Sequence, residues 1–137
     1  MKKNIPAPEL ILDNGSGRSR DERVSAATLA QLLEAAWKSS VMPEFISSLS
    51  LIGVNGALRQ RGKRAKTDSI TGQAPIKTGS LNDARAMAGY VLDATGRRWI
   101  VVMLIHHPNA ESTQAGQDAL LAAVHAGTLT TRANLKL

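Results

Sequence analysis

The sequence predicts an α+β fold, in which helices pack on an antiparallel sheet. Apolar residues at helical spacing occur early and late in the chain, and strand-like runs lie between them. The predicted order is therefore helix, helix, strand, strand, strand, helix. Strands that are grouped apart from helices are typical of α+β proteins. The 137 residues show no internal repeat and no low-complexity block, so we expect one domain over residues 1–137.

The first half of the chain predicts two helices. Residues 10–12 form a short apolar run that we interpret as a strand, and the turn formers at 13–17 predict a loop. A helix is expected to begin near Ser25, whose hydroxyl can cap the first turn. Its buried face is predicted from apolar residues at helical spacing, namely Leu29, Leu32, Leu33, Ala36 and the neighbouring Trp37. Pro43 fits the first turn of a second, shorter helix.

The second half predicts a hairpin and a closing helix. We expect strands at 86–92 and 99–105, joined by a turn at 94–97. The run 99–105 is apolar at nearly every position, which predicts a central strand covered on both faces. A helix should run from Ser112 or Thr113 to Ala126 and stop at Gly127.

Composition excludes several classes of function. There is no cysteine, so disulfides, Cys-ligated zinc and thiol nucleophiles are excluded. No run is long enough to span a bilayer, and no apolar segment follows the initial Met-Lys-Lys to make a secretion signal. The adjacent His106 and His107 are expected to point to opposite faces, one buried and one solvated, so no metal site is predicted.

The formal charge of +6 is concentrated in one short run. Its five basic residues are Arg59, Arg61, Lys63, Arg64 and Lys66. We interpret the run as a solvated loop, because no aromatic residue is interleaved for base stacking. Nucleic-acid binding is therefore not favoured, although contact with another polyanion remains an alternative.

The stretch around Lys77-Thr78-Gly79-Ser80 combines a cation, hydroxyls and a bare backbone on a predicted strand. This combination suits binding of a small anionic peptide end. Lys-Thr-Gly also resembles the third motif of penicillin-binding proteins and serine β-lactamases, which works beside a nucleophilic serine.

The resemblance extends along most of the chain. Several segments are similar, in the same order, to the D-alanyl-D-alanine carboxypeptidase/endopeptidase family, the class C low-molecular-mass penicillin-binding proteins. They are Asp13-Asn14-Gly15-Ser16-Gly17-Arg18-Ser19-Arg20-Asp21-Glu22-Arg23-Val24-Ser25, Val41-Met42-Pro43-Glu44-Phe45, Gly53-Val54-Asn55-Gly56, Ile76-Lys77-Thr78-Gly79-Ser80-Leu81 and Ala88-Gly89-Tyr90-Val91-Leu92. Arg18 and Asn55 stand where the family usually has leucine and aspartate.

The resemblance implies the C-terminal part of a catalytic domain with the β-lactamase/transpeptidase-like fold. It implies that Lys77 is the active-site lysine and that Thr78 and Gly79 bind the C-terminal end of the peptide. The backbone N–H of Ser80 would complete the oxyanion hole. A peptidoglycan peptide or a β-lactam is the implied partner, the periplasm or cell envelope the implied location, and no cofactor is implied.

The nucleophile of that family has no counterpart in this sequence. None of its serines is followed three residues later by lysine, as the Ser-x-x-Lys motif requires. Ser80-Leu81-Asn82 matches the second motif, Ser-x-Asn, only by overlapping the third. We therefore expect a part of a serine-type carboxypeptidase that is inactive alone and that self-associates through uncovered apolar surface. The alternative is a non-catalytic binding module for a peptide or polyanion.

Overall fold

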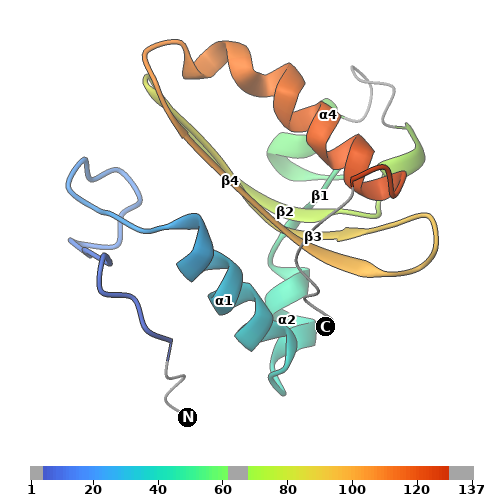
Figure 1. Ribbon diagram of the computed structural model, residues 1–137, viewed down its shortest axis with the longest axis horizontal. Helices are drawn as coiled ribbons and strands as arrows, with labels where there is room; N and C mark the ends of the chain where they lie inside the picture. Colours follow the sequence, from blue (N-terminus) through green and yellow to red (C-terminus); the bar gives the residue numbers. More distant parts are fainter. Residues whose placement is uncertain (1–4, 62–67, 130–137) are drawn as a thin grey trace.

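The computed structural model describes residues 5–61 and 68–129, and they form an α+β structure as predicted. An antiparallel sheet lies between α4 on one face and α1 on the other (Figure 1). The helices are α1 (Ala26–Trp37), α2 (Met42–Ser47) and α4 (Gln114–His125). The strands are β1 (Ser50–Leu51), β2 (Pro75–Leu81), β3 (Ala84–Leu92) and β4 (Arg98–His106). Three short 3-10 helices are η1 (Gly56–Leu58), η2 (Asp68–Ile70) and η3 (Ala110–Thr113).

The start of α1 is capped as the sequence predicts. Ser25 Oγ accepts a hydrogen bond from the backbone N–H of Thr28 at 3.0 Å. Glu9 joins the cap by accepting from the Thr28 hydroxyl at 2.5 Å and from the Ser25 N–H at 3.2 Å. These contacts, with Ser25 first and Thr28 second, lower the pKa of Glu9 to about 2. On the predicted helix face Leu33 is buried, whereas Leu32 is exposed.

The strand order β1-β2-β3-β4 is antiparallel throughout. Ile76 of β2 lies opposite Gly89 of β3, and Gly89 lies opposite Val101 of β4. A Cβ atom at Gly89 would come within 2.2 Å of the Pro75 carbonyl oxygen. Gly89 thus permits the close approach of two backbones, which fixes the register of β2 on β3.

The main core lies between the sheet and α4. It comprises Ile52, Leu58, Ile70, Ala74, Ile76, Met87, Val91, Val101, Leu121 and Val124. The strand residues between these core positions face α1 instead, because successive side chains along a strand point to opposite faces of the sheet. Tyr90 is one of these: it is fully buried, donates to the Leu33 carbonyl at 2.6 Å and packs against the Trp37 ring.

Two predictions about the strands are wrong. Residues 10–12 form no strand, and Ile11 makes only an isolated bridge with Arg23. The run 99–105 does not form a central strand, because β4 is the last strand of the sheet in the described part of the chain. Its apolar character instead reflects cover on both faces, since α1 and α4 both contact β4.

The end of β4 also differs from expectation. His106 and His107 are both exposed, whereas one of them was expected to be buried. The predicted stop of the final helix is confirmed, because α4 ends at His125 and Gly127 has a φ of 68°.

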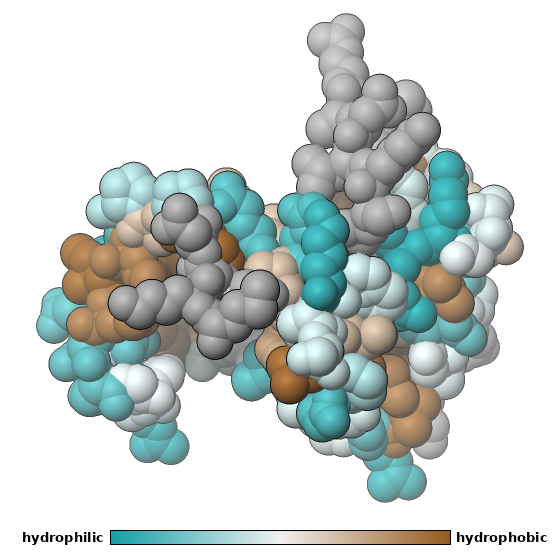
Figure 2. All heavy atoms as spheres, turned by 90° about the horizontal axis from the view of Figure 1, so that it is seen from below, coloured by the Kyte–Doolittle hydropathy of each residue, from teal (hydrophilic) through white to brown (hydrophobic). Residues whose placement is uncertain are grey.

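Apolar side chains remain exposed on the described surface. They include Leu10, Ile11, Leu12, Leu32, Val41, Val54 and Leu104. Figure 2, which views the molecule from the side of α1, shows apolar residues gathered at one end and scattered elsewhere. Self-association through such surface stays a prediction. No helix in the residues described is both long and apolar enough to cross a membrane.

The turn between β3 and β4 is organised by one buried carboxylate. Asp93 accepts from the Thr95 and Arg97 backbone N–H groups at 2.9 Å each and from the Trp99 indole N–H at 2.9 Å. Hydrogen bonds from Trp99 first, and then from Thr95 and Arg97, hold its pKa well below its ordinary value despite burial.

We expect Asp93→Asn to lower the melting temperature at pH 7 and to flatten its decline in acid. The folded-state pKa of Asp93 is depressed, so its contribution is present at neutral pH and is lost as the pH falls below its ordinary value of 3.8. Thermal melts between pH 7 and pH 2 measure this. Asp21→Asn makes the same charge change at an exposed position, and an equal loss in that variant would contradict the assignment.

A second prediction concerns the close approach at Gly89. Gly89→Ala should lower the free energy of unfolding by about 1–3 kcal/mol, because the new methyl group must displace the Pro75 backbone. Urea denaturation measures the change. Gly79→Ala is the matched control on β2, since a Cβ there meets only the Ala86 Cβ at an ordinary 3.7 Å. Equal destabilisation of both variants would refute this account of the register.

Candidate functional site

One long edge of β2 is open within the residues described. The two-residue strand β1 pairs only with Pro75 and Ile76. Residues 77–81 pair with β3 on one side and have no described strand on the other. The predicted site residues Lys77, Thr78, Gly79 and Ser80 therefore lie on a free sheet edge, which offers backbone groups to a ligand.

The register decides which backbone groups face outward. The Gln73 carbonyl accepts from Leu92 of β3, and the Ala74 carbonyl accepts from Ile52 on the β1 side. Alternate residues of a strand direct both their N–H and C=O to the same neighbour. Even-numbered residues of β2 thus point away from β3, so the backbone groups of Thr78 and Ser80 face the open edge.

Lys77 also reaches this edge, although its side chain starts from the face of the sheet that α1 covers. Its Nζ donates to the Thr78 carbonyl at 2.5 Å. The ammonium therefore lies beside the outward-facing backbone of β2 and stays exposed. The Thr78 and Ser80 side chains project from the opposite face, toward α4. The four predicted residues consequently meet at the edge of the sheet rather than on either face.

Gly79 is not needed for packing inside the described fold. A Cβ at this position would meet only Ala86, at an ordinary contact distance. Its φ is not in the left-handed region, so the backbone conformation does not require glycine either. The absence of a side chain leaves the strand accessible to another backbone, in keeping with a binding edge.

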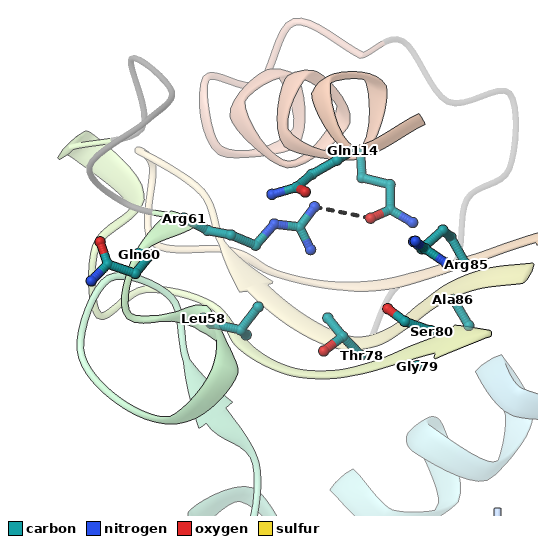
Figure 3. Close-up of a pocket in the computed structure, with 10 residues that line it drawn as sticks. Leu58, Gln60, Arg61, Thr78, Gly79, Ser80, Arg85, Ala86 and Gln114 are labelled. Carbon is teal, nitrogen blue, oxygen red and sulfur yellow. Dashed lines mark hydrogen bonds between the residues drawn. The ribbon is translucent and has the colours of Figure 1, made fainter. Parts of the chain in front are cut away.

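A pocket of about 220 Å³ opens next to this edge, between β2, β3 and α4 (Figure 3). Thr78, Gly79 and Ser80 form one wall. The rest of the lining is Leu58, Gln60, Arg61, Arg85, Ala86, Gln114 and Gln117. The pocket is thus a polar hollow with two guanidinium groups, on the α4 side of the sheet.

Sequence reasoning missed the ion pair that holds the pocket together. Arg61 donates from Nε to Asp118 Oδ1 at 2.9 Å and from Nη2 to Gln117 Oε1 at 2.9 Å. Only 11% of the Arg61 side chain and 12% of the Asp118 side chain are exposed. These partners are 57 residues apart in sequence, so no local pattern reveals the pair. The basic run therefore contributes Arg61 to a structural contact, while Lys63, Arg64 and Lys66 lie outside the described residues.

Arg85 was missed for a different reason. The predicted strand began at residue 86, whereas β3 begins at Ala84 after a two-residue turn at Asn82-Asp83. The tight turn places Arg85 directly opposite Ser80. Recognition of Asn82-Asp83 as a hairpin turn would have revealed this pairing from sequence.

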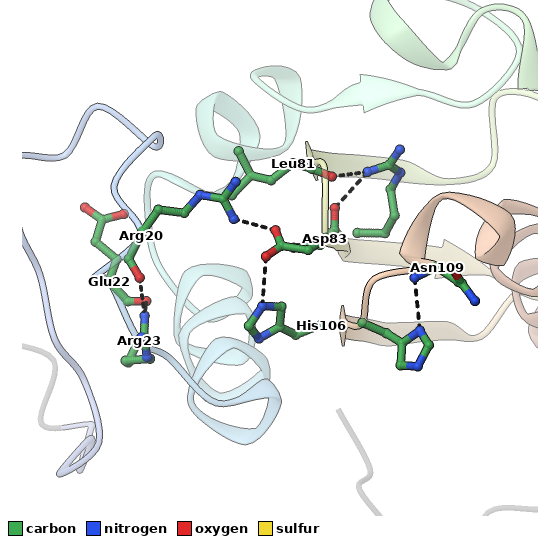
Figure 4. A network of polar contacts seen from close by, with 10 residues as sticks. Arg20, Glu22, Arg23, Leu81, Asp83, His106 and Asn109 are labelled. Atoms are coloured by element: carbon green, nitrogen blue, oxygen red, sulfur yellow. Dashed lines mark hydrogen bonds and ion pairs between the residues drawn. The ribbon is translucent and has the colours of Figure 1, made fainter.

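The hairpin turn is also tied to the N-terminal segment (Figure 4). Asp83 pairs with Arg20, and its Oδ2 lies 3.3 Å from His106 Nε2. Arg20 first and His106 second lower the pKa of the Asp83 carboxyl. The contact is solvent-exposed, so it orders the lip of the sheet more than it stabilises the fold. Among the described residues, no group of three or more His, Asp or Glu side chains is placed to hold a metal ion.

Comparison with known proteins accounts for this architecture. The family model of the D-Ala-D-Ala carboxypeptidase 3 (S13) family matches residues 2–126. The D-alanyl-D-alanine carboxypeptidase DacB of Haemophilus influenzae is 29% identical over 106 residues, which are 77% of this chain and 22% of that protein. A D-alanyl-D-alanine carboxypeptidase of an Actinomadura species is 31% identical over 118 residues, covering 81% of this chain and 21% of the relative. The chain thus spans about a fifth of the length of these curated relatives.

Solved structures agree at the level of the fold. The crystal structure of penicillin binding protein 4 from Haemophilus influenzae superposes with a TM-score of 0.76 at 24% identity, over 89% of this chain and 29% of that one. A second structure of the same protein, complexed with a β-lactam, gives the same TM-score and identity. The resemblance predicted from the sequence motifs is therefore confirmed, and the chain belongs to the D-Ala-D-Ala carboxypeptidase 3 (S13) family.

Proposed function

We propose that this chain supplies the peptide-binding wall of a serine-type D-alanyl-D-alanine carboxypeptidase/endopeptidase that acts on peptidoglycan peptides. The observation that carries the proposal is the open edge of β2, where the Lys77 ammonium and the outward backbone of Ser80 lie together. The family match supports the reaction class. The implied location is the periplasm or cell envelope, where peptidoglycan lies.

The site residues act on a peptide that lies along the edge. Lys77 supplies positive potential beside the scissile bond and the terminal carboxylate. The Thr78 hydroxyl donates to that carboxylate, and Gly79 leaves room for the peptide backbone. The Ser80 N–H points outward, where it can donate to the oxygen on which negative charge develops during acyl transfer.

The attacking group must come from elsewhere. No serine of these 137 residues is followed three positions later by lysine, so none has the activating partner of the family's first motif. Binding and oxyanion donors alone leave a large rate deficit when the nucleophile is lost. The chain on its own is therefore a binding part without hydrolytic activity. The polyanion alternative has no specific support, because most of the basic run lies outside the described residues.

Binding of an acetylated peptide that ends in D-Ala-D-Ala tests the edge. Lys77→Met should weaken binding at least about tenfold, because a charge-assisted hydrogen bond is lost. Gly79→Ala should weaken it as well, by blocking backbone approach, without lowering the melting temperature. Isothermal titration measures both effects.

Lys38→Met is the matched control, because Lys38 is an exposed lysine paired with Glu34 at the end of α1. It should bind the peptide like the unmodified chain. Equal weakening by Lys38→Met and Lys77→Met would remove the support for a site at the β2 edge.

A fluorescent penicillin tests the absence of a nucleophile. We expect no covalent adduct when the chain is incubated with the probe and measured by intact mass spectrometry. An unlabelled competitor and a heat-denatured sample control for non-specific reaction. A stoichiometric adduct mapped to one of the serines would overturn the proposal that the attacking group lies outside this sequence.

A further inference from the structure

The pocket beside β2 contains a buried donor without a described partner. Gln117 is only 3% exposed, and its Nε2 has no hydrogen-bond partner among the residues described. A buried amide N–H₂ left unpaired costs free energy, so such groups in folded proteins are normally satisfied. Gln117 lines the pocket, so a ligand there would meet this donor.

The orientation of the Gln117 amide is fixed by its other contact. Arg61 Nη2 lies 2.9 Å from Gln117 Oε1. A guanidinium can only donate, so the atom that faces Arg61 must be the acceptor oxygen. Arg61 is itself held by the Asp118 carboxylate at 2.8 Å. The ion pair thus directs Nε2 away from Arg61 and prevents an amide flip from satisfying it.

The net charge of the pocket comes from Arg85. The positive charge of Arg61 is matched by Asp118, whereas the Glu111 carboxylate lies 3.9 Å from Arg85 Nη2 and is 87% exposed. Arg85 Nη1 donates to the carbonyls of Leu81 and Ala84, which hold the guanidinium in place. Only 19% of the Arg85 side chain is exposed. A placed, partly desolvated guanidinium next to an unpaired amide donor is suited to an anion.

We propose that this pocket is a binding site for a small oxyanion, a carboxylate or a phosphate, held by Gln117 Nε2 and Arg85. The Ser80 hydroxyl, which projects toward α4, completes the donor set. A volume of about 220 Å³ accommodates an ion of this size and excludes a folded partner. The site goes beyond the proposed peptide edge, because it lies on the α4 side of the sheet and its main donors are not on β2.

Side-chain amide signals in the NMR spectrum of the ¹⁵N-labelled chain test the proposal. Sodium acetate and sodium phosphate are titrated separately at constant ionic strength, with sodium chloride as the reference. We expect a saturable shift of the Gln117 Nε2 signal with at least one of the two oxyanions and none with chloride. Acetate alone would identify a carboxylate site, and phosphate alone a phosphate site.

Gln117→Glu is the informative variant. It keeps an oxygen acceptor for Arg61 but replaces the amide donor by a carboxylate, so oxyanion affinity, followed through the Arg85 side-chain signals, should fall at least about tenfold. Gln114→Glu adds the same charge at an exposed lining residue and should change affinity by less than about threefold. Thermal melts establish that both variants are folded. If Gln117→Glu unfolds, Arg85→Gln replaces it as the test variant, and it should also lose oxyanion binding.

Lys77→Met separates this site from the peptide edge, because it should weaken peptide binding at least about tenfold and leave oxyanion binding nearly unchanged. Failure of the peptide test therefore leaves the pocket proposal standing, and the reverse also holds. If neither oxyanion causes a saturable shift of the Gln117 Nε2 signal, the pocket holds only water and the proposal is overturned. Equal losses in Gln117→Glu and Gln114→Glu would overturn it too, by reducing the effect to bulk charge.

Discussion

The pairing of β2 with β3 is the constraint on which the other features depend. The register places Ile76 opposite Gly89, where the two backbones come so close that a side chain cannot be accommodated. This pairing determines which face of the sheet each later side chain of β2 points to, because a shift of one residue would turn all of them to the other face. The same register turns the backbone of Ser80 outward and sets Arg85 across from Ser80.

The second organising contact is the packing of α4 on the sheet. Leu121 and Val124 join the core on the face that carries Ile76 and Val91. One turn earlier along the same helix, Gln117 and Asp118 receive Arg61 from the segment that follows η1. The pair is almost fully desolvated, so its value depends on complete hydrogen bonding rather than on Coulomb attraction alone. The helix thereby contributes apolar contacts at one end and a polar pocket wall at the other.

Local sequence patterns predicted the helices and the turn between β3 and β4 well, but not the Asn82-Asp83 turn between β2 and β3. The cap at Ser25, Pro43 in the first turn of α2 and the stop at Gly127 are all local backbone chemistry. The position of β4 in the sheet was not predictable in this way. A continuous apolar run indicates that both faces of a strand are covered, but it does not indicate whether the strand has a neighbour on each side. The Arg61–Asp118 pair is equally invisible, since it joins distant segments. The motif residues were identifiable because they are contiguous, but their arrangement around one edge required the register.

The short span of β1 has a consequence for how the molecule avoids faulty assembly. An exposed strand border is a template on which a foreign strand can grow into a continuous ribbon. Here the Lys77 ammonium donates a hydrogen bond to the Thr78 carbonyl oxygen, so this acceptor is not free for the backbone of an incoming chain. Gly79 offers no apolar side chain to hold such an intruder. The exposed Lys77 charge on this border thus disfavours its extension by a further strand.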